Sequence, residues 1–124
     1  MSYRDSHKTL IFAGGHLEPS LSGKKRITIR KYRPEAHDFK KGELVIGEFL
    51  NGYDMLLQIL ADTEMVLFRN LPDQPAQEDG YINSKEAFLG PKEYYPDLTE
   101  DDKAAIIRYR VIGQKPLGFN KHYS

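Results

Sequence analysis

A lysine, a threonine and an arginine follow a glycine at short spacing, as Gly23, Lys25, Thr28 and Arg30. A lysine ammonium that loses hydration and lies near a guanidinium has a lowered pKa, so it can act as a base for a neighbouring hydroxyl. A guanidinium can also form two parallel hydrogen bonds to a phosphate or a carboxylate. These residue types therefore fit two kinds of site, one that cleaves a bond and one that holds an anion.

Each of these residues also has a structural interpretation. Residues 24–33 hold six basic groups and no acid, and such a run is most often solvated surface. Thr28 can simply hydrogen-bond within a sheet. Arg30 is as well suited to pairing with an acid of a later loop as to binding an anion. If the fold brings this basic run, including Lys24, to a cleft, the run becomes an anion site.

Two acids, Glu78 and Asp79, directly precede Gly80 and are the candidates for an acidic partner of the lysine. Carboxylates in a polar segment of this kind are more often solvated than functional. If one of them reaches the cleft, it can support proton transfer between the lysine and the hydroxyl. The sequence leaves open which of the two faces the cleft.

Aromatic side chains flank the same segments and offer surfaces for stacking a nucleic-acid base. The candidates are Tyr32, Phe39 and Tyr81, and a stacked base contributes about 1–3 kcal/mol. Most aromatic residues of the chain should nevertheless lie in the core. The four histidines show no metal-ligand spacing, so we expect surface histidines, no metal site and no cofactor.

Short strands must position these residues. Residues 26–32 alternate isoleucines with Thr28 and Arg30, which is typical of a strand with one buried face. Strict alternation would place Lys25 opposite Thr28, so a bend at Gly23 must break the alternation. Further strands are expected over residues 8–13, 43–50, 53–61 and 105–112, and over 65–68 as an extension of the strand at 53–61 past a bulge.

Turn and helix signals separate these strands. Asn51-Gly52 accepts the positive φ that both positions of a tight hairpin turn require. The other signals predict one helical turn at 19–22, a loop over 71–80, a helix over 85–89 capped by Asn83 or Ser84 and ended by Gly90-Pro91, and a turn capped by Thr99.

The order of these elements predicts an α+β, mainly β fold, a small β-barrel of five to six strands with two or three short helices. A parallel sheet is disfavoured, because parallel pairs need crossover helices that this chain lacks. The 124 residues suit a single domain, with its core over about residues 8–113 and a loosely docked tail over 114–124.

The composition limits the classes of function. The absence of cysteine excludes disulfides and thiolate zinc sites. The N-terminus lacks the apolar run of a signal peptide, and no run approaches the ~20 apolar residues that cross a bilayer, so we expect a cytoplasmic protein with no membrane partner. The 18 basic and 18 acidic residues balance, which argues against sequence-blind attraction to polyanions. The acidic run over 93–102 is interpreted as solvated surface.

The spacing of the first four residues above resembles the G-x-K-x-x-T-x-R signature of ASCH domains, in the PUA-like superfamily. The resemblance continues at residues 39–45 (FKKGELV), at residues 77–81 (QEDGY) and in a hydrophobic closing strand, and it covers roughly residues 8–113. It implies a PUA-like barrel whose cleft is lined by the signature residues, and an association with RNA or modified nucleosides.

One small bacterial group of this family hydrolyses the N4-acetyl group of acetylcytidine with a lysine, a threonine and a glutamate. By resemblance, Lys25 and Thr28 match the first two. Asp79 stands where the family has its glutamate, and Glu78 lies one position earlier. An aspartate holds its carboxylate one methylene closer to the backbone, and reacting groups must lie within about 0.5 Å of their productive geometry.

Three functions are compatible with these observations, and their oligomeric context is not predicted. The favoured one is a cleft that binds RNA or a modified nucleotide, with ligand contacts from Gly23, Lys24, Lys25, Arg30, Tyr32 and Tyr81. The runner-up is an amidohydrolase of an N-acylated nucleoside, with Lys25, Thr28 and Asp79 or Glu78 as catalytic residues. The third is a non-catalytic interaction domain in which the signature residues only brace the barrel.

Overall fold

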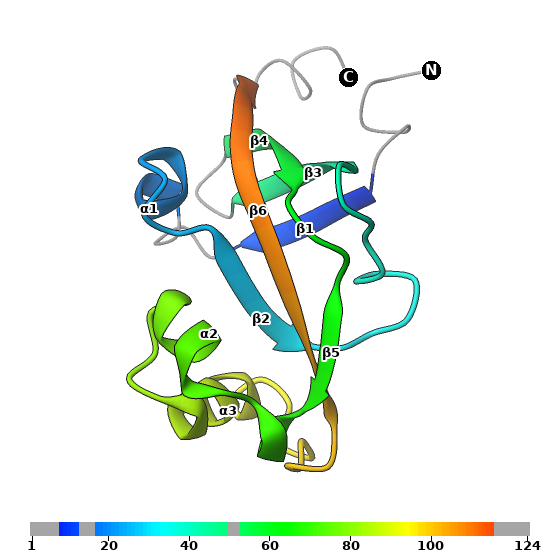
Figure 1. Cartoon of the computed structure of the whole chain (residues 1–124), viewed down its shortest axis with the longest axis vertical. Coiled ribbons are helices and arrows are strands. Elements are labelled where there is room, and N and C mark those ends of the chain that lie inside the picture. The colour runs from blue at the N-terminus through cyan, green and yellow to red at the C-terminus, as the bar shows by residue number, and fades with distance from the viewer. Residues whose placement is uncertain (1–7, 13–16, 50–52, 116–124) are drawn as a thin grey trace.

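The computed structural model describes residues 8–12, 17–49 and 53–115 (Figure 1). In this part of the chain six strands form one curled sheet, accompanied by three α-helices and a 3₁₀-helix. The strands are β1 (Lys8–Phe12), β2 (Ile27–Lys31), β3 (Leu44–Phe49), β4 (Tyr53–Ile59), β5 (Glu64–Leu67) and β6 (Lys103–Lys115). The helices are α1 (Leu17–Leu21), η3 (Phe68–Asn70), α2 (Asp73–Glu78) and α3 (Ser84–Lys92). The predicted α+β, mainly β fold class is confirmed.

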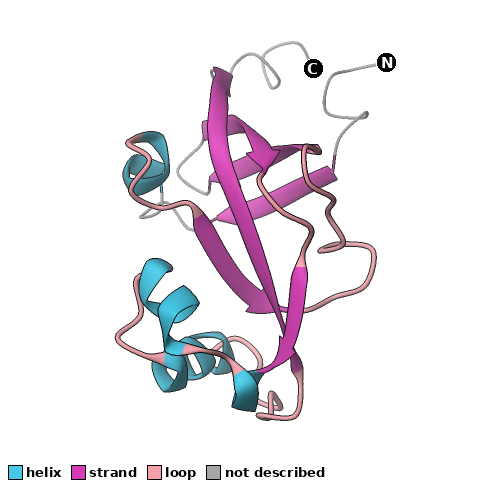
Figure 2. Ribbon diagram, in the orientation of Figure 1, coloured by secondary structure: helices cyan, strands magenta, loops and turns pink. Residues whose placement is uncertain are grey.

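The sheet follows the order β1-β3-β4-β6-β2, and β5 pairs with β6 beyond the end of β4. β1 runs parallel to β3, and the other pairs are antiparallel. The long β6 connects the two parts of the sheet, because its first half pairs with β2 and β5 and its second half pairs with β4 (Figure 2). No ladder joins β1 to β2 in the described ranges, so the half-barrel stays open along the seam between these two strands.

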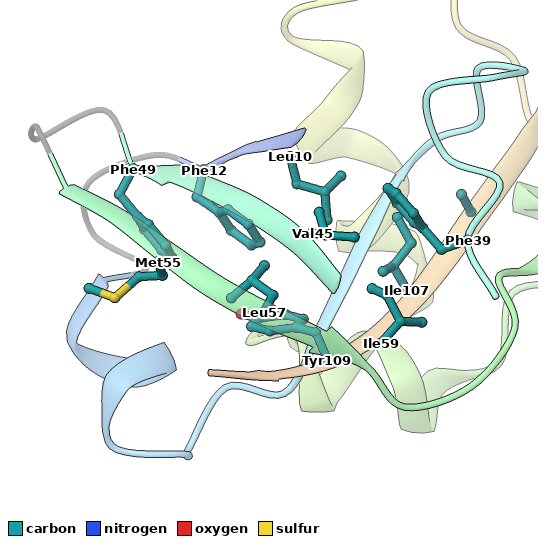
Figure 3. Close-up of a cluster of buried hydrophobic side chains, with 11 residues drawn as sticks. Leu10, Phe12, Phe39, Val45, Phe49, Met55, Leu57, Ile59, Ile107 and Tyr109 are labelled. Atoms are coloured by element: carbon teal, nitrogen blue, oxygen red, sulfur yellow. The ribbon is translucent and has the colours of Figure 1, made fainter. Parts of the chain in front are cut away.

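The first core cluster fills the inside of the half-barrel (Figure 3). Alternate residues of β6, among them Ile107 and Tyr109, point into it. The rings of Phe12 and Phe49 stack there with 4.7 Å between their centroids. Phe39 belongs to the same cluster and is 1% exposed, so its predicted role in stacking a base is wrong.

The second core cluster lies between the outer face of β2 and β6 and the helices α2 and α3. The two isoleucines of β2 supply part of the sheet side, and Ala76 of α2 and Ala87 of α3 supply part of the helix side. Because side chains alternate along a strand, Thr28 and Arg30 then face the inside of the half-barrel. The helices therefore fix which face of β2 carries the polar signature residues.

The predicted hairpin between β3 and β4 is confirmed, and the turn at Asn51-Gly52 stays a prediction. The two strands pair antiparallel with Phe49 opposite Tyr53, while the dipeptide itself lies outside the described residues. β5 is assigned as a strand of its own, but it pairs antiparallel with β6 just as β4 does, from Glu64 onward where β4 stops at Ile59. The ladder is thus interrupted close to the predicted bulge, where the side chain of Asp62 accepts the N–H of Lys41 at 2.8 Å.

The predicted loop over residues 71–80 is wrong, since α2 occupies most of it. Pro72 stands at the N-cap of α2 and Pro75 within its first turn. The first N–H groups of a helix have no partner within the helix, so a proline there removes no hydrogen bond. Asp73 adds a negative charge beside the positive end of the helix.

α3 begins as predicted and ends later. The side chain of Asn83 caps it by accepting the N–H of Glu86 at 3.0 Å. The predicted break at Gly90-Pro91 is wrong, because the helix continues to its last residue two positions after the glycine. Gly90 has another role there: a Cβ atom at this position would lie 2.8 Å from the hydroxyl of Tyr81.

The closing strand is longer than predicted. β6 passes the expected end at Ile112 and continues to Lys115, so the first two residues of the expected tail are strand. The rest of that tail lies outside the described residues. Thr99 does stabilise a turn, since its hydroxyl accepts the N–H of Asp101 at 3.2 Å.

Candidate functional site

The candidate site begins at the bend between α1 and β2. Gly23 has a φ of 80°, a left-handed conformation that glycine adopts without strain, and its N–H donates to the carbonyl of Ser20 at 3.2 Å. The N–H of Lys25 donates to the carbonyl of Pro19 at 2.8 Å. β2 begins only at Ile27, so Lys25 precedes the strand and strand alternation does not set its direction.

The ammonium of Lys25 forms a buried ion pair with the carboxylate of Asp79, and the two side chains are only 6% and 5% exposed. The second carboxylate oxygen accepts the N–H of Ile29 at 3.0 Å. Successive N–H groups of an antiparallel strand point to opposite sides, and the N–H of Tyr32 donates to Lys103 at the start of β6. The N–H of Ile29 therefore points away from β6, and Asp79 satisfies a donor on the free edge of β2.

The end of α2 delivers Asp79 to this position. Asp79 is the C-cap residue, its N–H donates to the carbonyl of Pro75 at 3.0 Å, and Gly80 follows with a φ of 102°. The neighbouring Glu78 pairs with Arg108 at 3.1 Å, on a partly exposed surface. Of the two candidate acids, Asp79 is the one that contacts the signature lysine.

The surroundings of Lys25 act on its proton in two directions. Burial, followed by the charge of the Arg30 guanidinium, lowers the pKa of Lys25 to about 8. The carboxylate of Asp79 opposes this shift, because it stabilises the ammonium. A lysine whose pKa lies this close to neutrality can give up and regain its proton, as a general base must.

Thr28 and Arg30 form the second pair of the site. The Nε–H of Arg30 donates to the hydroxyl of Thr28 at 3.2 Å. The guanidinium carbon lies 4.7 Å from the centre of the Phe12 ring, a cation–π distance. Burial lowers the pKa of Arg30 to about 10, which leaves the guanidinium charged at neutral pH. Its two terminal nitrogens have no hydrogen-bond or ion-pair partner among the residues that the structure describes.

The Lys25–Asp79 pair and the Thr28–Arg30 pair lie close together, with no hydrogen bond or ion pair between them among the described residues. Within the described ranges no hydrogen bond links Lys25 to Thr28. Arg30 connects the pairs electrostatically, because its charge contributes to the lowered pKa of Lys25. The alternative in which Arg30 pairs with Glu78 or Asp79 is wrong, since its guanidinium bonds to Thr28 instead.

The other residues predicted to bind a ligand lie around these pairs. Lys24 is exposed and lines an open depression beside α1. Tyr32 is partly buried and donates its hydroxyl to Asp38 at 2.8 Å. Tyr81 packs against the second core cluster, burial raises its pKa, and the charge of Arg30 acts on it in the opposite direction. Tyr32 continues the face of β2 that carries Arg30 and packs against the first core cluster, with its ring 6.5 Å from the His37 ring.

Two side chains near Arg30 escape prediction from the sequence. His37 is 5% exposed, so the expectation of a surface histidine is wrong for it. The ring of Tyr95 lies 4.9 Å from the Lys31 ammonium and close enough to Arg30 to affect its pKa. The sequence does give one indication of Tyr95, because Tyr94 and Tyr95 are adjacent tyrosines within the acidic run over residues 93–102. The other histidines, at positions 7, 16 and 122, lie outside the described residues.

Two general properties of the described ranges bear on the site. They contain no group of three or more His, Asp or Glu side chains that could hold a metal ion. Every helix in them is too short or too polar to cross a lipid bilayer.

Comparisons with known proteins concern the fold. The chain matches no family model, and no curated protein matches its sequence. A crystal structure of a protein from Enterococcus faecalis, assigned to the family model DUF984, is 17% identical with a TM-score of 0.67, over 88% of this chain and 82% of that one. An ASCH domain from Lactobacillus crispatus is 12% identical with a TM-score of 0.60, over 91% and 87%.

A third similar structure is the ASCH protein of Zymomonas mobilis. It is 14% identical with a TM-score of 0.63, and the match covers 94% of this chain and 81% of that one. Identities this low establish similarity of the fold and leave the chemistry to the residues themselves. The curled sheet that positions Lys25, Thr28 and Arg30 is thus an ASCH-like fold, as the signature predicts.

Proposed function

We propose that the chain binds RNA or a nucleotide, including a modified one, at the mouth of the half-barrel, with Arg30 as the principal contact to an anionic group. The observation that carries this proposal is the state of Arg30. Its guanidinium is charged, is held by Thr28 and the Phe12 ring, and keeps its terminal nitrogens unpartnered among the described residues. A guanidinium fixed in this way is preorganised to bind a phosphate.

Lys25 has a supporting role in this proposal. Its ammonium is buried and engaged by Asp79, so it is not available to a phosphate. The ion pair joins the bend before β2 to the end of α2, and Asp79 also holds the free edge of β2. Lys25 and Asp79 are therefore positioning residues for the strand that carries Arg30. Tyr81 and Tyr95 provide aromatic surface for a base.

Binding titrations of a short labelled RNA and of cytidine 5′-monophosphate test this proposal. We expect Arg30→Gln to weaken binding about tenfold or more, because a charge-assisted hydrogen bond contributes roughly 1.5–3 kcal/mol. The matched control is Arg26→Gln, which removes an exposed charge from the same basic run and should change affinity less than about twofold. Equal effects of the two substitutions, in variants with wild-type thermal unfolding, would contradict the proposal.

A second candidate function is hydrolysis of an N-acylated nucleoside such as N4-acetylcytidine. The observation that favours it is the lowered pKa of Lys25 beside the carboxylate of Asp79. In this reaction the neutral amine of Lys25 takes the proton of the Thr28 hydroxyl, and the oxygen attacks the acyl carbon. The C–N bond breaks, the leaving nitrogen takes a proton from Lys25, and water then cleaves the acyl-threonine ester. The Nε–H of Arg30 already donates to the Thr28 hydroxyl and would stabilise the negative charge on this oxygen as its proton leaves for Lys25.

This second function requires Lys25 to approach Thr28, to which it has no hydrogen bond in the described ranges. The test is incubation of the protein with N4-acetylcytidine and chromatographic measurement of released cytidine. Hydrolysis predicts turnover that is lost in Lys25→Ala and in Thr28→Val. Wild-type release no faster than that of Lys25→Ala would exclude the reaction for this substrate and leave the binding function standing.

A further inference from the structure

A pocket lies at the seam where the half-barrel does not close. It is lined on one side by residues 8–11 of β1 and on the other by Arg30 and the turn that follows β2. Its volume is about 310 Å³, at the lower end of the range of small-molecule sites. It is therefore large enough for one compact group of a ligand, beside the guanidinium to which the proposed function assigns the anion.

The charges around this pocket are mostly positive. Lys8, Arg30 and Arg33 line it, against a single acid, Glu35. The ammonium of Lys8 is already engaged by the carbonyl of Asp38 at 2.7 Å. The side chains of Arg30 and Arg33 have no ion-pair partner among the described residues. Two guanidinium groups are thus left to act on whatever enters the pocket.

A buried neutral donor completes the lining. His37 is 5% exposed, and its Nδ1 accepts the N–H of Arg33 at 3.0 Å. Burial, followed by the charges of Arg30 and Arg33, lowers the pKa of His37 to about 4, while Asp38 acts in the opposite direction. A neutral ring that accepts at Nδ1 carries its proton on Nε2. This Nε2–H has no hydrogen-bond partner in the described ranges.

The turn that holds this histidine is fixed in place. The N–H of His37 donates to the carbonyl of Arg33 at 3.1 Å. The hydroxyl of Thr63 donates to the carbonyl of His37 at 2.6 Å and accepts the N–H of Phe39 at 3.0 Å. The backbone of the turn and the His37 ring are therefore held in position before a ligand arrives, which lowers the entropy lost on binding.

We infer that this seam pocket takes the phosphate of a mononucleotide, bound by the guanidinium groups of Arg30 and Arg33 and by the Nε2–H of His37. The inference deepens the proposed function and rests on it, because it narrows the ligand from RNA or any nucleotide to a mononucleotide and names the pocket that holds its phosphate. All three donors lie on the side of the pocket formed by β2 and the turn that follows it. Together they offer more N–H groups than the two oxygens of a carboxylate accept in a single bidentate pair, which suits a phosphate with three free oxygens.

Calorimetric titration of the full chain with cytidine 5′-monophosphate, cytidine and inorganic phosphate tests this inference. We expect the monophosphate to bind at least tenfold more tightly than cytidine. Arg33→Gln should remove most of that difference and leave cytidine binding unchanged. Arg33 is exposed, so the variant should fold, and Arg26→Gln serves as its matched control with less than about a twofold effect.

Replacing Glu35, the single acid of the pocket, should change the affinity for the monophosphate in the opposite direction. Glu35→Gln removes the negative charge that faces the phosphate, so it should strengthen monophosphate binding about twofold. Its effect on cytidine binding should be nil. A pocket that binds no anion would respond to neither substitution.

The outcomes separate the two proposals. A preference for the monophosphate that Arg30→Gln removes but Arg33→Gln leaves unchanged overturns the seam pocket while the proposed function stands, whereas equal affinities for cytidine and its monophosphate count against both. Binding of inorganic phosphate that Arg33→Gln abolishes, with no detectable binding of cytidine, supports the anion pocket and counts against a nucleoside site. Tight binding of acetate at the affinity of phosphate would overturn the assignment of a tetrahedral anion.

Discussion

The side chains of Lys25 and Asp79 show how the signature residues stabilise the site before any ligand binds. Both are buried, and each is the other's counter-ion. Removing one member of such a pair leaves an uncompensated charge in the interior, whereas removing both is often tolerated. The pair therefore offers a direct test of its structural role.

We expect Lys25→Met to lower the free energy of unfolding by about 3–5 kcal/mol, because it leaves the Asp79 carboxylate buried without its cation. Lys25→Met combined with Asp79→Asn should recover most of this loss, since the asparagine oxygen can still accept the N–H of Ile29. Urea unfolding followed by circular dichroism measures both.

The control for that pair is Glu78→Gln, which breaks the partly exposed ion pair with Arg108 and should cost less than about 1 kcal/mol. A loss in Lys25→Met no larger than in Glu78→Gln would show that Lys25 and Asp79 do not stabilise the fold.

His37 predicts a dependence of stability on pH. Its folded-state pKa, about 4, lies below the unfolded value of 6.5, so the unfolded chain binds the extra proton first on acidification. The contribution of the neutral His37 ring to the free energy of unfolding is therefore complete above pH 6.5 and is lost as the pH falls toward 4. We expect His37→Asn, whose oxygen can replace Nδ1 as acceptor, to flatten the unfolding free energy over this interval. Parallel curves for the two proteins would contradict the assignment.

At the scale of elements, the bend before β2 decides where the lysine points. Gly23 has a φ of 80°, and a Cβ atom there would meet nothing within 4 Å. The effect of Gly23→Ala is therefore purely conformational. We expect it to lower the unfolding free energy by about 1–2 kcal/mol. Thermal unfolding measures this against Gly113→Ala, where φ is not positive and the nearest neighbour is 3.6 Å away. Equal losses in the two variants would argue against a required left-handed bend.

Some of the strands and helices could be predicted from the sequence and others could not. Residues 26–32 and 105–112 have a period of two, and this period survives in the structure because one face of each strand is buried. α2 could not be predicted from the same kind of pattern. Its two prolines are typical of loops. They are compatible with a helix only because Pro72 is the N-cap residue and Pro75 lies in the first turn.

The candidate site was predictable in part for the same reason. The motif identified Lys25, Thr28 and Arg30, since their spacing is local. The choice of Asp79 over Glu78 depends on where α2 ends, and the burial of His37 depends on a bond from Thr63, 26 residues later in the chain. Contacts over such separations leave no local signal in a single sequence.

At the scale of the whole molecule, the charge balance limits how nucleic acids can bind. The formal net charge is zero, so attraction to a polyanion must come from the few cations at the seam. With Arg30 and Arg33 as the contacts, about two phosphates are neutralised. The logarithm of RNA affinity should then fall with the logarithm of salt concentration at a slope of about −1.4. Titrations from low to high salt measure this slope, and a value steeper than about −4 would indicate a larger basic surface.

The open seam between β1 and β2 is the feature on which the proposed function depends most. Amide chemical-shift mapping of the ¹⁵N-labelled chain during titration with cytidine 5′-monophosphate tests it most directly. We expect the largest shifts at Thr28, Arg30, Arg33 and His37, with little change in α3 beyond its contacts with Tyr81. Shifts that instead cluster around Lys24 and α1, with the seam unchanged, would contradict it.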